Sequence, residues 1–559
     1  MDKRFFLAIG LTLVVIIATP LIFPNANPPQ STGTADSAAA PGASPTVSSQ
    51  PAAPGAGTAA HVVAALKPDS AKRPAPPMHA ETTVVATARA NVAFTSSGGT
   101  PLAVTLRDHR ALGSRNGPPA TIQHATLPLL QYAVVTNGDT VAFSQVGFSV
   151  IKSQSASEQA VEFTATERNI RLAARYTIDS SDRDAYLVHA QVSVTGTSGK
   201  SFLLITMPRG FVSQEADPAE DATHLAYAFK PQKRTASSVA FSKLDPGERR
   251  IEEGPFTWVA AKSKYFLVAL LADSVSTPFV ELHVIGAPRT GKLVTQGEAT
   301  VIADPSRGPV TFDIYAGPQE WTRLRALGRD FENVNPYGGW IQGVVQPFST
   351  IVMRTLLWMK RTVNVNYGWV LIIFGVVIRL ALWPLNQSAM RSSIRMQRIQ
   401  PELQAVQAKY KSDPAKMQAE IQKVYAAHGM SMLSPLMGCL PMLIPMPILF
   451  ALFFVFQNTI EFRGVSFLWL PDISLKDPFY IFPVLMGASM FVQSWIGMRN
   501  APPNPQAKMM MYLMPVMFTA LFINFASGLT LYYTVQNLAA LPQQWLLSNE
   551  RTKATTATG

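Results

Sequence analysis

The sequence predicts a multi-domain membrane protein: a polytopic α-helical membrane core, with six spans in all, that carries a large extracytoplasmic antiparallel β-sandwich. Three observations support this fold class. Hydrophobic residues make up 48% of the chain and charged residues only 15%, which favours a membrane protein with a soluble part. Six apolar segments resemble membrane spans. A long stretch of short alternating runs lies between the first two of them and is typical of strands.

The N-terminus is predicted to be a signal anchor over residues 1–23. Its apolar run is longer than the core of a cleaved signal peptide, about 7–15 residues, and no clear small-residue cleavage site follows. Lys3 and Arg4 precede the run and are expected to hold the N-terminus in the cytoplasm. Residues 24–81 are rich in Ala, Pro, Ser, Gly and Thr, so they are predicted to form a disordered tether.

A β-sandwich is predicted over residues 82–335, on the periplasmic side because the anchor precedes it. The segment AYLVHAQVSV places Val188, Ala190 and Val192 on one face, and VTFDIYAGP alternates in the same way. The next segment, 338–361, changes to helical spacing, but several cations interrupt its apolar face. We expect an amphipathic helix on the outer membrane surface there, with a helix packed on the sandwich as the alternative.

The membrane core is predicted over residues 366–550, followed by a cytoplasmic tail at 551–559. Lys and Arg gather in the loop between the second and third spans, which is typical of a cytoplasmic loop and places both termini in the cytoplasm. This placement explains much of the net charge of +12 without DNA as a partner. The five spans of the core are predicted at 366–386, 437–459, 478–497, 509–524 and 527–547.

The basic loop, residues 388–429, is predicted to be a helical hairpin in the cytoplasm. Its apolar residues recur at helical spacing, and Asp413 followed by Pro414 indicates a new helix start. Its charged outer face is either an ordinary solvated surface or a docking surface for the ribosome or a targeting receptor.

Several classes of chemistry find no support in the sequence. Cys439 is the only cysteine, which excludes intrachain disulfides and cysteine-based metal sites. The histidines show no metal-binding spacing, and no predicted span contains Asp or Glu, which weakens a proton-coupled transporter. Two stretches, 196–201 and 286–293, imitate a phosphate-binding loop, but each lacks a required residue. The second leads into a predicted strand, so its glycines are predicted to form a turn. We expect no metal, no cofactor and no catalytic residue.

Arg379 lies inside the second span, where a charge costs roughly 2.5–3.5 kcal/mol on insertion scales. It lies about six residues, or roughly 9 Å, from the predicted cytoplasmic edge, so its side chain could simply snorkel towards water. Alternatively, Gly375, Trp383 and Asn386 share its helical face and line a wet cavity with it. With no carboxylate in the spans, its partner is expected to be water, a backbone carbonyl or an anionic ligand.

Polar residues in the other spans favour a shared hydrophilic groove. The last span carries a polar stripe, and further amides and a hydroxyl occur in the third and fourth spans. Such stripes can also hold helices together, and this alternative stays open. The residues concerned are Thr530, Tyr533, Thr534, Asn537 and Gln544 on the last span, Gln457 on the third, and Ser489 and Gln493 on the fourth.

Residues 366–550 resemble the YidC/Oxa/Alb family of membrane protein insertases. The resemblance rests on NYGWVLII, VVIRLALWPL, QPELQAVQAKY, SPLMGCLPMLIPMPILFALF, DPFYIFPVLMGASMF and FASGLTLYYTVQNL, which together cover the membrane core. The order of anchor, sandwich, surface helix and five spans resembles the Gram-negative branch. The resemblance implies a groove open to cytoplasm and lipid, with Arg379 as its charge and Tyr533 as its functional aromatic residue. Gly375 stands where some members have a hydroxyl residue.

The resemblance implies a function as well as a fold: insertion and folding of inner-membrane proteins, alone or beside the Sec translocon and its accessory subunits. Nascent membrane proteins and membrane lipid are the other implied partners, and the third and fifth spans are the implied apolar slide for a client. Two alternatives from other classes are a polytopic transporter of small anions and an envelope enzyme that acts through the sandwich.

Overall fold

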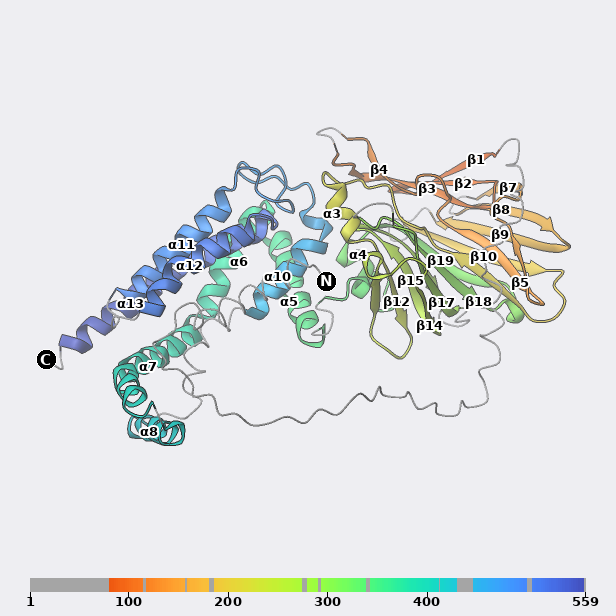
Figure 1. The fold of residues 1–559 in the computed structure, drawn as a ribbon. Helices are drawn as coiled ribbons and strands as arrows, with labels where there is room; N and C mark the ends of the chain where they lie inside the picture. Colours follow the sequence, from red (N-terminus) through yellow and green to blue (C-terminus); the bar gives the residue numbers. More distant parts are fainter. Residues whose placement is uncertain are drawn as a thin grey trace, which may run out of the picture.

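Residues 80–337 fold mainly into β-sheets and residues 342–556 into helices, and the two parts lie beside each other (Figure 1). The computed structural model describes residues 80–113, 117–155, 158–179, 185–273, 279–289, 293–337, 342–411, 413–429, 446–499 and 505–556. The predicted signal anchor and nearly all of the predicted tether lie outside these residues.

The strands in the described part of the chain form three antiparallel sheets, with orders β1-β2-β3-β4, β13-β12-β15-β16-β19-β10-β9-β8-β7 and β14-β17-β18-β11-β5-β6. Their bounds are β1 Thr82–Ala86, β2 Ala90–Thr95, β3 Thr100–Arg110, β4 Pro119–Gln123, β5 Gln131–Thr136, β6 Asp139–Ala142, β7 Ser149–Gln154, β8 Glu158–Glu167, β9 Ile170–Asp179, β10 Leu187–Thr195, β11 Ser201–Thr206, β12 Ala226–Pro231, β13 Ser237–Ala240, β14 Arg249–Glu253, β15 Phe256–Lys262, β16 Phe266–Ala272, β17 Phe279–Gly286, β18 Gly297–Ala303 and β19 Val310–Pro318.

One hydrophobic core joins the sheets. The nine- and six-stranded sheets meet through the hydroxyls of Tyr132 and Tyr176, which lie 3.0 Å apart, and through the rings of Phe279 and Phe312. The four-stranded sheet joins the same core through Phe94, whose ring contacts Tyr176. The prediction of antiparallel strands is confirmed. Along β10, Val188, Ala190 and Val192 are buried while His189 and Gln191 are exposed, and Val194, predicted on the same face as the buried residues, is half-buried. The separate four-stranded sheet was not predicted.

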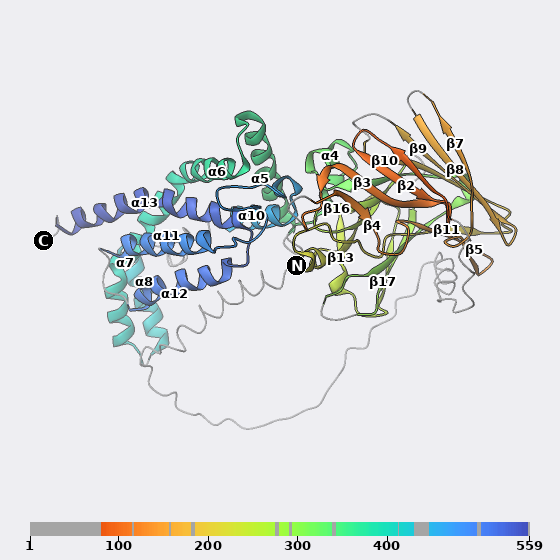
Figure 2. The same cartoon turned by 90° about the horizontal axis from the view of Figure 1, so that it is seen from above.

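Two short helices belong to the β-rich domain, and the long helices follow them in the chain. Figure 2 shows the long helices grouped on one side of the molecule and the sheets on the other. The α-helices are α3 Pro218–Thr223, α4 Trp321–Ala326, α5 Gln342–Val363, α6 Tyr367–Ala381, α7 Trp383–Lys409, α8 Pro414–Ala427, α10 Met446–Asn458, α11 Ile481–Met498, α12 Pro505–Phe522 and α13 Ser527–Thr556. The 3-10 turns among the described residues are η1 Phe241–Lys243, η2 Pro305–Arg307, η3 Phe331–Val334 and η5 Ile460–Phe462.

The helices differ in length from the predicted spans. Of those described, α11 alone has the length and hydropathy of a membrane span, and α5 with α6 meets the same criterion only as a segment bent by 117°. The predicted span 366–386 is corrected to α6, which ends at Ala381 because Pro384 lies in the first turn of α7. Residues 437–445 lie outside the described part, so the count of six spans stays a prediction. The predicted tail is helical as far as Thr556.

α5 corresponds to the predicted surface helix. One of its faces, which includes Val352 and Leu356, is buried in the core that it shares with α10. Ile351 and Trp358, on another face, are 61% and 63% exposed. A helix that packs on one side and exposes apolar side chains on the other is suited to the boundary of a membrane.

α7 and α8 form a hairpin, as the sequence predicts. Asp413 caps α8 by accepting a hydrogen bond from the backbone N–H of Lys416. Ile399 and Leu403 of α7 are buried together with Tyr425 of α8 in a small core of their own. The hairpin is therefore held mainly by contacts between its own two helices.

A buried ion pair joins the β-rich domain to the helices. The guanidinium of Arg463, just after η5, donates to both carboxylate oxygens of Glu215 at 3.0 and 2.8 Å, and to the carbonyl of Gln214 at 3.1 Å. Both side chains are less than a tenth exposed. The Arg463 guanidinium also lies over the ring of Phe266 in β16. The two parts of the chain are therefore fixed to each other at this point.

Candidate functional site: a cation between two helices

Arg379 lies near the C-terminal end of α6 and faces α13. Its Nη2 donates a hydrogen bond of 2.8 Å to the side-chain oxygen of Gln543, and its Nε is buried without a partner. Gln543 in turn donates to the backbone carbonyl of Trp383, the first residue of α7, at 3.1 Å. The partner of Arg379 is thus a neutral side-chain amide, which the sequence did not indicate. The positive charge is held in position without being neutralised.

One face of α13 supplies the contacts to α6. Gln536, two turns before Gln543, donates to the carbonyl of Gly375 at 2.8 Å and to the hydroxyl of Tyr532 at 3.1 Å. A Cβ at Gly375 would lie 3.0 Å from Cγ1 of Val535, so this glycine permits a close approach of the two helices. The close packing of the two helices explains why glycine, and not a hydroxyl residue, stands at position 375.

The polar stripe predicted on the last span faces a different helix. Asn537 donates to the carbonyl of Met486 at 3.3 Å and to the hydroxyl of Ser489 at 3.2 Å, both on α11. Thr530 and Thr534 are buried, and their hydroxyls donate to backbone carbonyls. Those two bonds lie within α13, whereas Asn537, and Thr534 through a second bond of 3.4 Å to the carbonyl of Phe482, join α13 to α11, which is the helix-joining alternative for such a stripe.

The other predicted residues are dispersed. Asn386 is buried in α7, beyond the helix break at Leu382, and so does not share the helix of Arg379. Tyr533 packs against Phe522 of α12, with ring centroids 5.2 Å apart. Gln457 lines a small cavity beside Lys264 and Glu220 of the β-rich domain. Gln493 is half-buried on α11, and Gln544 lies against Gly497 of that helix.

The structure therefore brings together Arg379, Gly375, Tyr532, Gln536 and Gln543. The signal that could have identified the last three is their own helical spacing, with offsets of four and eleven residues from Tyr532. The stripe predicted from the sequence contains the residue after each of these three, and it is therefore rotated by about 100° around the helix.

The set can attract an anion, and its one hydroxyl is that of Tyr532, which accepts a hydrogen bond from Gln536. In the described residues, no carboxylate forms an ion pair with Arg379, and no group of His, Cys, Asp and Glu has the arrangement of a metal site. Apolar side chains are exposed around it, including Val377 and Leu380 on α6 and Leu538 on α13, which are at least half exposed. Apolar exposure of this extent is suited to lipid rather than water.

The fold and this site define a class: a membrane protein with a large soluble domain and a cation held among apolar helices. The model of the 60Kd inner membrane protein family matches residues 358–555, and that of the YidC periplasmic domain matches residues 82–351. The chain is therefore an inner-membrane protein whose β-rich domain is periplasmic.

Two related proteins support the same assignment and identify the family. A membrane protein insertase YidC from Syntrophus aciditrophicus is 27% identical over 98% of this chain and 100% of that protein. One from Chlorobium phaeovibrioides is 31% identical over 69% of this chain and 68% of that protein. A crystal structure of an active YidC insertase, 20% identical, covers 84% of this chain and 94% of its own, with a TM-score of 0.34. The chain belongs to the YidC family of membrane protein insertases. Its function is membrane protein insertion, and nascent membrane proteins are the substrates that this membership implies.

Proposed function

We propose that the chain inserts clients by receiving their hydrophilic tail at Arg379, between α6 and α13, without an enzymatic step. The observation that supports this is the partner of the arginine: a guanidinium among apolar helices is bonded to a neutral amide, Gln543, at 2.8 Å. The bond from the ionised Arg379 to Gln543 is already charge-assisted, but a carboxylate adds the attraction of opposite charges and can accept two N–H bonds from the guanidinium, whose Nε has no partner. A carboxylate in a client's tail can therefore displace the amide.

Release of the client follows from the apolar surroundings. Once the tail has passed, the apolar segment of the client gains by leaving sideways into lipid, because no backbone or charge then remains in the hydrocarbon without a partner. Val516 of α12 is 68% exposed and is suited to this path, together with α10. In this proposal the polar contacts shorten the hydrocarbon path that the tail must cross.

Further parts of the proposal concern partners and orientation. We infer six spans with both termini in the cytoplasm, because Lys and Arg gather in the loop that forms the α7–α8 hairpin. The hairpin is the proposed contact for the ribosome or a targeting receptor, and the Sec translocon and membrane lipid are the other proposed partners.

Replacing Gln543 by glutamate tests the proposal most simply. A carboxylate at this position would pair with Arg379 inside the protein, so insertion of a client with an acidic tail should fall to near the level of Arg379→Ala. A matched client with a neutral tail should be much less affected. The measurement is the fraction of each client protected from protease in vesicles that contain the purified variant.

Gln544→Glu is the matched control, because it adds the same charge one residue away, on the face of α13 towards α11. It should retain the parent's preference between the two clients. If Gln543→Glu and the parent insert the acidic-tail client equally, Arg379 does not act by its charge.

Deleting residues 392–428 tests the role of the hairpin. Since its helices pack mainly on each other, the deletion with a short flexible linker should leave the other helices folded. We expect insertion of ribosome-bound clients to fall severalfold, while a purified client presented without the ribosome is inserted normally. Insertion of ribosome-bound clients at the parental rate would contradict a docking role.

A further inference from the structure

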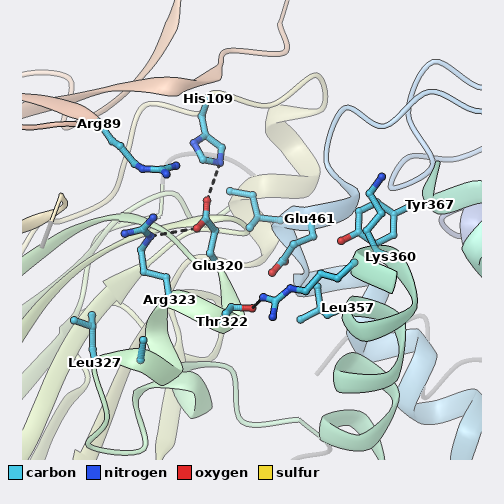
Figure 3. A pocket seen from close by; sticks show the side chains of 13 residues that line it. Arg89, His109, Glu320, Thr322, Arg323, Leu327, Leu357, Lys360, Tyr367 and Glu461 are labelled. Atoms are coloured by element: carbon cyan, nitrogen blue, oxygen red, sulfur yellow. Dashed lines mark hydrogen bonds and ion pairs between the residues drawn. The ribbon is translucent and has the colours of Figure 1, made fainter. Parts of the chain in front are cut away.

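A cavity of about 520 Å³ lies where the β-rich domain meets the helices, away from Arg379. Its size is in the range of small-molecule sites. Figure 3 shows side chains that enter it from both parts: Glu320 and Arg323 from the domain, and Lys360 and Tyr367 from α5 and α6. Arg361 of α5 lines it as well. Because α5 follows the periplasmic domain and α6 begins at Tyr367, the cavity lies at the periplasmic end of α6.

Two of the cations that line the cavity are bonded only to neutral groups. Lys360 donates to the carbonyl of Val365 at 2.8 Å, and Arg361 donates to the hydroxyl of Thr322 at 3.1 Å. No carboxylate among the described residues forms an ion pair with either, whereas Arg323 pairs with Glu320. Each of the two cations retains N–H donors for a further acceptor.

The acid nearest to these cations only partly offsets them. Glu461, in η5, also lines the cavity, and one of its carboxylate oxygens is buried without a partner. Burial raises the pKa of Glu461 to about 7. This carboxyl is therefore partly protonated near neutral pH, and the cavity has an excess of positive charge.

The position of the cations indicates a lipid rather than a free anion. Lys and Arg are usually concentrated on the cytoplasmic side of membrane proteins, so two adjacent cations at the periplasmic end of a helix call for an anionic partner on that side. Trp358, one turn before Arg361 on α5, is 63% exposed, and Leu357 forms part of the cavity wall. Tryptophan is enriched at the level of lipid headgroups.

We propose that this cavity binds the phosphodiester headgroup of a phospholipid from the periplasmic leaflet, with Lys360 and Arg361 as donors to the phosphate oxygens. The bound lipid lies between the periplasmic domain and α5, so it fixes the distance of the domain from the membrane surface. This site is separate from Arg379 and does not depend on the proposed path of the client.

The test measures phospholipid that remains bound to the purified full chain in detergent, by native mass spectrometry, after addition of phosphatidylglycerol or phosphatidylethanolamine. Lys360→Gln/Arg361→Gln should lower retention by about tenfold or more, because two charge-assisted hydrogen bonds are lost. The matched control is Lys233→Gln/Arg234→Gln, an exposed Lys-Arg pair between β12 and β13, which should retain lipid as the parent does.

Competition with inorganic phosphate distinguishes the source of the ligand. Millimolar phosphate should leave the bound lipid in place, since it lacks the acyl chains. Displacement of the lipid by phosphate would show a free-anion site and overturn the assignment. Equal retention of lipid by the parent and both double variants, all with the same thermal midpoint, would overturn it as well.

Discussion

Replacing Arg379 by alanine is expected to lower the insertion of a client with an acidic translocated tail by about tenfold or more, the size of one charge-assisted hydrogen bond. A matched client with a neutral tail should lose much less, because only the attraction is removed. Arg379→Lys should retain most activity, since it keeps the charge, and Arg379→Glu should be worse than alanine because it repels the tail.

The snorkelling alternative predicts a different order of variants. If Arg379 is only tolerated in the span, alanine removes its insertion cost and should be neutral or stabilising. The protected fraction of both clients, measured in vesicles that carry each variant in equal amounts, separates the two views. An alanine variant that inserts both clients as well as the parent would exclude an electrostatic role of Arg379.

Glu215→Ala is expected to have the largest effect on stability. It leaves the Arg463 guanidinium buried without a counter-charge, and breaking a buried pair in this way costs about 3–5 kcal/mol. We expect a lower thermal midpoint and faster proteolysis between the β-rich domain and the helices. Glu215→Leu/Arg463→Met should be less damaging than Glu215→Ala, because it removes both charges from the interface.

The matched control for this prediction is Glu81→Ala, which breaks an exposed pair with Lys152 in the same domain. Exposed pairs contribute about 0–1 kcal/mol, so this variant should unfold almost as the parent does. Equal destabilisation by the two alanine variants would contradict a fixing role for the buried pair.

The elements that the sequence predicted well are those with a local signal. The alternation in β10 and the Asp413 cap of α8 depend on neighbours within a few residues, and both are present. No local signal sets the four-stranded sheet apart, because β1–β4 differ from the other strands in which strands they pair with and not in the alternation of their residues. The length of α6 was overestimated because apolar composition continues past Leu382 although the helix does not.

The site was predicted only in part because it depends on the rotation of one helix relative to its neighbours. α13 has polar residues on two faces: Gln536 and Gln543 towards α6, and Asn537 towards α11. Adjacent residues of a helix differ by about 100° in direction, so composition alone cannot decide which face meets Arg379. The partners on the neighbouring helices, Gly375 and Ser489, decide it.

The most direct test of the proposed path is photo-crosslinking from the two faces of α13 to a stalled client with an acidic tail. A photoreactive residue is placed at position 536, on the face towards Arg379, or at position 537, on the face towards α11. We expect an adduct with the client's tail from position 536 that weakens in the Arg379→Ala background, and little or none from position 537. Adducts of equal strength from both positions, or one from position 537 alone, would contradict the proposed path.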